Sequence, residues 1–428
     1  MKLAINGGTP IRCTPFPAHV TIGAEEKEAV SQVLDSGKLS KYLGCWHQQF
    51  YGGEQVRALE KEWATHFGTK HAIAVNSCTS GLYCAVGATE IEPGDEIIVS
   101  PYTMSASATA ALIFNAIPVF ADVEPNYFCL DANSTEEKIT SKTRAIVVVD
   151  IFGQPYDVDR INAIAKKHNL VVIEDCAQAP GAKYNGRFAG TLGHMGIFSF
   201  NYHKHIHTGE GGMIVTDDDN LAERCRLIRN HAEAVVEAKD EQNLVNMIGF
   251  NFRMPEIEAA IGRCQLKKLD SLLHKRITNV RYIEKGLSSI PAIQNPKTRE
   301  NCTHVYYGHA CQFDKKVAGV ERNRFMEAVK AELAHHTLRE EEGVQLGCGY
   351  VKPLYLMPIF QQRIAYGSKG YPFNLSDVTY NKGLAPICEQ LHFEKLFTHE
   401  FMLPSMQEKD MDDVIKAFHK VWELRTTL

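Results

Sequence analysis

The stretch Ser199-Phe200-Asn201-Tyr202-His203-Lys204-His205-Ile206-His207-Thr208-Gly209-Glu210-Gly211-Gly212 lies between two apolar runs. Residues 197–200 lead into it and residues 213–216 follow it, so we expect two buried strands joined by a loop that carries Lys204. An ammonium group held among small residues can have its pKa lowered and can form a Schiff base with an aldehyde. Because most of the 46 lysines and arginines must be solvated, this stretch alone only suggests a catalytic lysine.

A second buried-strand pattern lies upstream, at residues 170–173, and ends in Glu174-Asp175-Cys176. An acid at the carboxyl end of a parallel strand lies where α/β folds bind ligands. Asp175 could hold a pyridinium nitrogen protonated, as the electron-sink chemistry of pyridoxal phosphate (PLP) requires. The alternative is that Asp175 caps the helix that follows, and without Lys204 we would favour that cap.

A third segment, Val75-Asn76-Ser77-Cys78-Thr79-Ser80-Gly81-Leu82, follows a strand pattern at residues 72–75 and opens a helix that runs to about Ala88. Free N–H groups and small hydroxyl residues at a helix N-terminus bind anions, and here the anion would be a cofactor phosphate. An ordinary helix N-cap made by Ser77 or Thr79 explains the same residues equally well.

Strand and helix patterns alternate through the first half of the chain. The strand candidates are residues 72–75, 96–100, 117–123, 145–150, 170–175, 197–200 and 213–217. Helical patterns lie between most of them, for example at 104–115 and 156–168, and a further amphipathic helix is expected at 54–67. Such alternation predicts an α/β fold with a mainly parallel seven-stranded sheet covered on both faces.

A second, smaller domain is expected after a long helix. Pro255 suits the first helical position, and apolar side chains recur to about Gly286, so we predict a connecting helix over 255–286. We expect a large domain at residues 1–280 and a small α+β domain at residues 281–428.

Two shorter elements are expected in the small domain, a strand at 309–313 and a helix at about 322–335. Residues 338–350 are acidic and then glycine-rich, and we expect an exposed loop there that could border the active site.

The composition excludes several classes of protein. The net charge is −5 with interspersed acids and bases, which argues against a nucleic-acid partner. The 12 cysteines are scattered without a C-x-x-C pair, as in a reducing compartment. We find neither a signal peptide nor a membrane-spanning run, so we expect a cytoplasmic protein. His203, His205 and His207 lack acidic or cysteine partners at a metal-site spacing, and we expect no metal.

Together the three segments resemble the DegT/StrS-type sugar aminotransferases, which are PLP-dependent enzymes of fold type I, related to aspartate aminotransferase. The resemblance covers roughly residues 20 to 425, and the block from Ser199 to Gly212 is its most specific part. Further motifs stand in family order at residues 93–99, 152–155, 229–231 and 249–254. The large domain would therefore bind PLP.

The resemblance implies roles for the residues around the cofactor ring. Lys204 would form the internal aldimine and move the proton between Cα and C4′. Asp175 would pair with the pyridine nitrogen, and Gln178 would bond the phenolic oxygen. Met104 stands where the family usually stacks an aromatic side chain on the ring, and its thioether could still pack there.

The resemblance also implies how the phosphate is held. Cys78, through its backbone N–H, Thr79 and Ser199 would hold it within one subunit. Asn251 would reach the phosphate of the neighbouring subunit, which implies a homodimer with two shared active sites.

The activity implied is transfer of an amino group from glutamate or glutamine to a keto sugar, in amino-sugar biosynthesis. A nucleotide-linked keto-deoxyhexose is the first expectation for the acceptor, and a keto-inositol or other small ketose is the alternative. Pro353-Leu354-Tyr355 replaces the family's usual Pro-Leu-His, which bears on substrate identity. PLP-dependent sugar dehydratases of this fold carry histidine in place of the lysine, so Lys204 argues against that activity. Retention of the whole set of cofactor residues argues against a non-enzymatic regulator.

Overall fold

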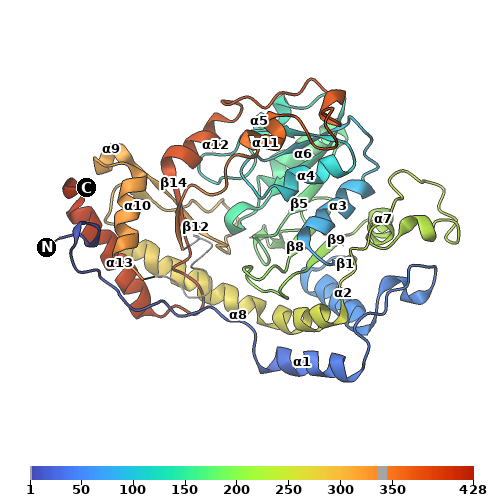
Figure 1. Cartoon of the computed structure of the whole chain (residues 1–428), viewed down its shortest axis with the longest axis horizontal. Coiled ribbons are helices and arrows are strands. Elements are labelled where there is room, and N and C mark those ends of the chain that lie inside the picture. The colour runs from blue at the N-terminus through green and yellow to red at the C-terminus, as the bar shows by residue number, and fades with distance from the viewer. Residues whose placement is uncertain (1, 335–344) are drawn as a thin grey trace.

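Figure 1 shows a computed structural model of the chain, which describes residues 2–334 and 345–428. Its largest element is a seven-stranded sheet with the order β1-β9-β8-β5-β4-β2-β3. The strands are β1 (His71–Val75), β2 (Glu96–Val99), β3 (Ile117–Phe120), β4 (Thr143–Val149), β5 (Val171–Asp175), β8 (Met195–Ser199) and β9 (Gly212–Thr216). All seven predicted strands are confirmed.

The sheet is parallel except at β9, which runs antiparallel to both β1 and β8. The other neighbours in the sheet pair in parallel, and helices connect most of them. Residues 200–211 contain no crossover helix, so the chain after β8 turns back along its neighbour instead of crossing the sheet. This return loop carries Lys204 and brings it to the carboxyl end of β8.

Both faces of the sheet are covered because alternate side chains of each strand point to opposite faces. Ile73 and Ile214 pack in one hydrophobic cluster with helices α3, α4, α6 and α7, while Ala72 and Met213 pack in another with α2 and α8. The helices of the large domain are α1 (Ala24–Asp35), α2 (Glu54–Phe67), α3 (Cys78–Ala88), α4 (Ala106–Ile113), α5 (Ala132–Glu137), α6 (Val158–His168) and α7 (Asp219–Arg229). Helices expected at 54–67, 104–115 and 156–168 are confirmed.

The long helix α8 (Glu256–Leu287) runs beneath the large sheet and on into the small domain, as Figure 1 shows in yellow. Pro255 is its N-cap rather than its first helical residue. The N-terminal residues Leu3 and Phe16 pack in the hydrophobic cluster of the small domain. Both chain ends therefore lie at that end of the molecule (Figure 1).

A four-stranded antiparallel sheet of order β10-β12-β14-β13 forms the centre of the small domain. Its strands are β10 (Ile293–Gln294), β12 (His309–Phe313), β13 (Leu346–Cys348) and β14 (Leu396–His399). The later helices are α9 (Lys315–Ala318), α10 (Arg322–Ala331), α11 (Pro358–Gln361), α12 (Pro386–Gln390) and α13 (Glu408–Glu423). Three two-residue strands form a separate small sheet: β6 (Lys183–Tyr184), β7 (Arg187–Phe188) and β11 (Cys302–Thr303).

The prediction of an exposed loop at residues 338–350 is wrong for the residues of that range that the structure describes, 345–350. Residues 338–344 lie outside the described residues, but Leu346–Cys348 form the edge strand β13 against β14, and Leu346 is buried. Three residues are too few to show an alternating pattern, so only the pairing with β14 identifies this strand. Tyr350, the last residue of that stretch, lines the cavity described below.

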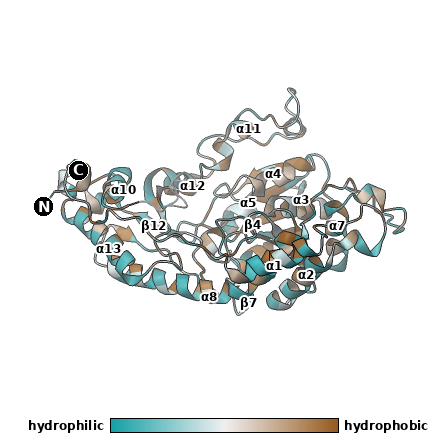
Figure 2. Cartoon of the chain, turned by 60° about the horizontal axis from the view of Figure 1, so that its bottom comes forward, coloured by the Kyte–Doolittle hydropathy of each residue, from teal (hydrophilic) through white to brown (hydrophobic). Residues whose placement is uncertain are grey.

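Hydropathy follows the layers of the fold. In Figure 2 the inner helices α3 and α4 are largely brown, whereas α1, α8 and α13 present teal outer faces. Within residues 2–334 and 345–428, no helix combines the length and the apolar character that crossing a membrane requires.

Candidate active site

One cavity of about 220 Å³ opens at the carboxyl ends of the central strands. Val149, Asp175 and Ser199, the last residues of β4, β5 and β8, line it. The N-terminus of α3 forms one wall, and Tyr307 and Tyr350 reach in from beyond α8. Parallel strands end together at one edge of a sheet, and this edge is where open α/β sheets bind ligands.

Lys204 lies in this cavity, as predicted from the sequence. Its backbone N–H donates to the Asn201 carbonyl oxygen at 2.9 Å, which fixes the turn after β8. Its Nζ lies 4.3 Å from the centre of the Tyr307 ring. Burial lowers the pKa of the Lys204 ammonium group, an effect that Tyr350 and Asp175 partly oppose. A lysine whose pKa is lowered spends more time as the neutral amine, which is the nucleophile.

Asp175 is 4% exposed and lies in the same cavity. The Ser107 hydroxyl donates to its Oδ2 at 2.6 Å, and the Ala177 N–H donates to its Oδ1 at 3.2 Å. Burial raises the pKa of the Asp175 carboxyl group despite these bonds. Residues 176–182 form turns rather than a helix, so Asp175 is not a helix cap.

Gln178 also lines the cavity, and its amide oxygen is held by the backbone. The Phe152 N–H donates to Gln178 Oε1 at 2.7 Å, and Gln178 Nε2 donates to the Tyr350 hydroxyl at 2.9 Å. Phe152 has a positive φ of 57°, a conformation that a bulky side chain adopts only under constraint. Its carbonyl oxygen accepts from the Tyr307 N–H, so two cavity residues hold this turn.

The N-terminus of α3, where we predicted an anion site, lies at the cavity. Ser77 is the N-cap, and its Oγ accepts from the Ser80 N–H at 3.0 Å. Cys78, Thr79 and Ser199 all line the cavity beside it. The N-cap interpretation and the anion-site interpretation are therefore compatible, because Ser77 caps the helix while the residues after it face the cavity.

Met104 also lines the cavity, just before α4, with its side chain 60% exposed. It is therefore free to pack on a ring that enters from solvent. Of the neighbouring histidines, His203 lines the cavity, whereas His205 is buried with Nε2 3.1 Å from the Val305 carbonyl oxygen.

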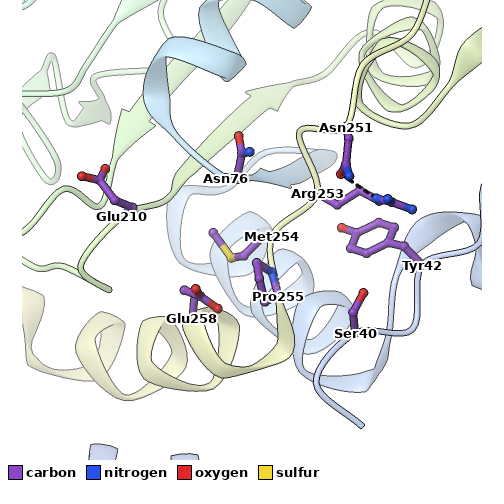
Figure 3. A pocket seen from close by; sticks show the side chains of 9 residues that line it. All are labelled: Ser40, Tyr42, Asn76, Glu210, Asn251, Arg253, Met254, Pro255 and Glu258. Atoms are coloured by element: carbon purple, nitrogen blue, oxygen red, sulfur yellow. Dashed lines mark hydrogen bonds between the residues drawn. The ribbon is translucent and has the colours of Figure 1, made fainter.

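Asn251 is not brought to this cavity within one chain. It lines a separate hollow of about 640 Å³ with Tyr42, Arg253 and Glu258, shown in Figure 3. Its Oδ1 accepts from the Arg253 Nε at 2.7 Å, and the residue is exposed. Glu210 lines both the hollow and the Lys204 cavity.

Sequence reasoning did not name several residues of the site, although it expected residues 338–350 to border it: Ser107, Asn201, Glu210, Tyr307 and Tyr350. Asn201 and Glu210 stand in the quoted lysine stretch, and the 2.9 Å bond from Asn201 Nδ2 to Glu210 Oε1 fastens the two ends of the loop. Ser107 lies three residues after Met104, and this short spacing was the only feature of the sequence that pointed to it. Tyr307 and Tyr350 are far from the other motifs in sequence, so only the packing of the small domain reveals them.

Comparison with known proteins agrees with this geometry. The GDP-perosamine synthase of Caulobacter vibrioides is 41% identical over 277 residues, which are 64% of this chain and 74% of that protein. The L-glutamine:2-deoxy-scyllo-inosose aminotransferase of Micromonospora echinospora is 31% identical over 433 residues, 98% of this chain and 97% of that protein. An aminotransferase of known structure from Psychrobacter cryohalolentis has a TM-score of 0.79 at 30% identity, covering 96% of this chain and 99% of that chain. Residues 20–395 match the DegT/DnrJ/EryC1/StrS aminotransferase family, so this chain belongs to that family and is a PLP-dependent aminotransferase.

Proposed function

We propose that this aminotransferase moves an amino group from glutamate or glutamine to the carbonyl carbon of a nucleotide-linked keto-deoxyhexose. The observation that carries the proposal is the meeting of Lys204, Asp175 and Gln178 in one cavity, beside the N-terminus of α3. A lysine of lowered pKa, a buried acid and an anion site are what a cofactor with an aldehyde, a ring nitrogen and a phosphate needs.

The residues present fit PLP. The Asp175 carboxyl accepts from the Ser107 hydroxyl and the Ala177 N–H, but burial still raises its pKa, so a protonated ring nitrogen beside it would stabilise the ionised form. Gln178 Nε2 keeps one N–H for the ring's phenolic oxygen. Thr79, Ser199 and the Cys78 N–H would hold the phosphate, and Met104 would cover the ring.

When bound, PLP supplies the electron sink that stabilises negative charge at the donor's Cα. The chain supplies the rest. Lys204 would hold the cofactor through its aldehyde and would move a proton between the donor's Cα and the cofactor's C4′ carbon. Asp175 would keep the ring nitrogen protonated, and the walls formed by Tyr307 and Tyr350 would limit the access of water.

Two acceptor classes have support. The 41% identity to a GDP-perosamine synthase favours a nucleotide-linked keto sugar. A keto-inositol is the second candidate, because the inosose aminotransferase aligns with 98% of this chain, whereas the synthase aligns with 64%. Retention of Lys204 argues against a dehydratase.

The test is a two-step half-reaction screen. The purified protein should be yellow, and borohydride followed by peptide mapping should place PLP on Lys204. The protein is then loaded with glutamate or glutamine, freed of donor, and mixed in turn with nucleotide-linked 3-keto and 4-keto hexoses and with keto-inositols. Return of the original absorbance identifies the acceptor class. A PLP adduct on another lysine, or absorbance that no keto sugar restores, would contradict the proposal.

We also propose a cytoplasmic homodimer with shared active sites. All 12 cysteines are free, which suits a reducing compartment. Asn251 is exposed and lies away from the cavity of its own chain, as expected of a residue that serves a neighbouring subunit.

A further inference from the structure

The backbone fixes the orientation of the Gln178 side chain. Because the Phe152 N–H donates to Oε1 at 2.7 Å, the amide oxygen faces the protein and the amide nitrogen faces the cavity. The nitrogen carries two hydrogens. One goes to the Tyr350 hydroxyl at 2.9 Å, and the other is available to a ligand. The direction of the N–H bond to Tyr350 therefore sets the direction of the N–H that is available to a ligand.

Tyr350 is itself held firmly. It follows β13 of the small domain, and its ring packs edge-on against Phe152 with centroids 5.0 Å apart and against Tyr102 at 6.0 Å. Burial raises the pKa of the Tyr350 phenol, so it stays neutral across the working pH range. Its oxygen can accept from Gln178 only while β13 stays in place, which links the small domain to the cofactor cavity.

We propose that Tyr350 is a positioning residue for the cofactor ring: it aims the second amide hydrogen of Gln178 at the phenolic oxygen of PLP. The inference rests on the proposed function, since it needs PLP on Lys204. A donor at that oxygen stabilises its negative charge and so lowers the proton affinity of the neighbouring nitrogen that Lys204 contributes. Without Tyr350 only the Phe152 N–H holds the amide, so the amide plane can rotate about that one bond, the second hydrogen is no longer aimed at the phenolic oxygen, and that proton affinity should rise.

The experiment is a pH titration of the visible absorbance of the PLP-bound protein, which reports protonation of that nitrogen without turnover. We expect Tyr350→Phe to raise the midpoint by about half to one pH unit, the size of shift that loss of one hydrogen bond gives. Tyr380→Phe is the matched control. Tyr380 is buried among aromatic rings, its hydroxyl donates to the Pro118 carbonyl oxygen at 2.8 Å, and it does not line the cavity.

A double-mutant cycle decides whether Tyr350 acts through Gln178. In a Gln178→Leu background, Tyr350→Phe should no longer move the midpoint. A midpoint equal to that of Tyr380→Phe, a downward shift, or a shift that persists undiminished in the Gln178→Leu background would overturn the inference. Melting curves of the same proteins show whether folding is intact. Failure to trap PLP on Lys204 at all would contradict the proposed function, and the two failures are thus distinct.

Discussion

Asp175 is buried and accepts hydrogen bonds from the Ser107 hydroxyl and the Ala177 N–H. Its charge state determines what the cavity can do. We expect Asp175→Asn to fold and to bind PLP, because the Ser107 hydroxyl can still donate to the amide oxygen. Turnover should fall at least about tenfold, since one hydrogen bond to a charged group is worth roughly 1.5–3 kcal/mol. Single-turnover rates with glutamate measure this, with the exposed Asp270→Asn on α8 as control. Turnover close to wild type would mean that the carboxylate only shapes the turn after β5.

His304 gives a residue-level test of buried electrostatics. It stacks on Tyr306 with centroids 3.9 Å apart, and its Nδ1 accepts from the Tyr306 N–H at 3.0 Å. Burial lowers the pKa of His304 to about 3, so below the ordinary pKa of about 6.5 only the unfolded chain takes up this proton. Stability from this residue is therefore lost as pH falls, by at most about 1.4 kcal/mol per pH unit.

The comparison variant for this effect is His304→Asn, which keeps an acceptor but does not titrate. Other buried groups also change their protonation with pH. The informative quantity is therefore the difference in unfolding free energy between the wild-type protein and His304→Asn. That difference should decline steadily from pH 7 to pH 4.5 in urea unfolding experiments. A difference that stays constant with pH would show that folding leaves the pKa of His304 unchanged.

At the scale of elements, the anion site depends on how closely α3 approaches β9. Gly212 opens β9, and a Cβ there would lie 2.7 Å from the Cys78 backbone nitrogen. Gly212→Ala should push the N-terminus of α3 aside, at a cost of about 1–3 kcal/mol for overpacking. We expect PLP affinity to fall at least about tenfold, because the N–H groups that face the phosphate move. Equilibrium titration with PLP measures the loss.

The matched control for that substitution is Gly44→Ala, where a Cβ would meet only an ordinary contact of 3.6 Å with His231. If Gly212→Ala binds PLP as tightly as Gly44→Ala does, α3 tolerates displacement and its N-terminus is not the phosphate site.

For the whole molecule, the central question is whether two chains share each site. We expect mixtures of Asn251→Asp and Lys204→Ala subunits to regain activity after subunit exchange. A mixed dimer would place both lesions in one site and leave the other intact. With equal amounts and random exchange, about a quarter of wild-type activity should return, since half the dimers are mixed and each has one intact site.

Exchange itself must be shown independently, for example with affinity tags of two kinds on the two variants. If exchange occurs and activity does not return, Asn251 serves its own chain. In that case the hydrogen bond between Asn251 and Arg253 would only stabilise the loop that contains both residues.

The sequence by itself determined the elements and most of the chemistry. Hydrophobic runs of five or so residues marked all seven strands of the large sheet, because a strand buried on both faces must be apolar throughout. Lys204 and Asp175 could be singled out because each lies at or just after the end of such a strand, whereas Gln178 was named only through the resemblance to the family. Strand ends converge in a parallel sheet, so the pattern placed Lys204 and Asp175 at the edge where α/β folds bind ligands.

Only the tertiary structure decided what depends on pairing and packing across long separations. The antiparallel direction of β9 and the strand at Leu346–Cys348 follow from their partners, which no local pattern specifies. The placement of Tyr307 and Tyr350 depends on where α8 carries the small domain. Ser107 is a site residue only because α4 begins beside β5, and the loop of Asn251 is held by its pairing with Asn230. Contacts of this kind join residues tens to hundreds of positions apart, and the sequence contains no periodic signal for them.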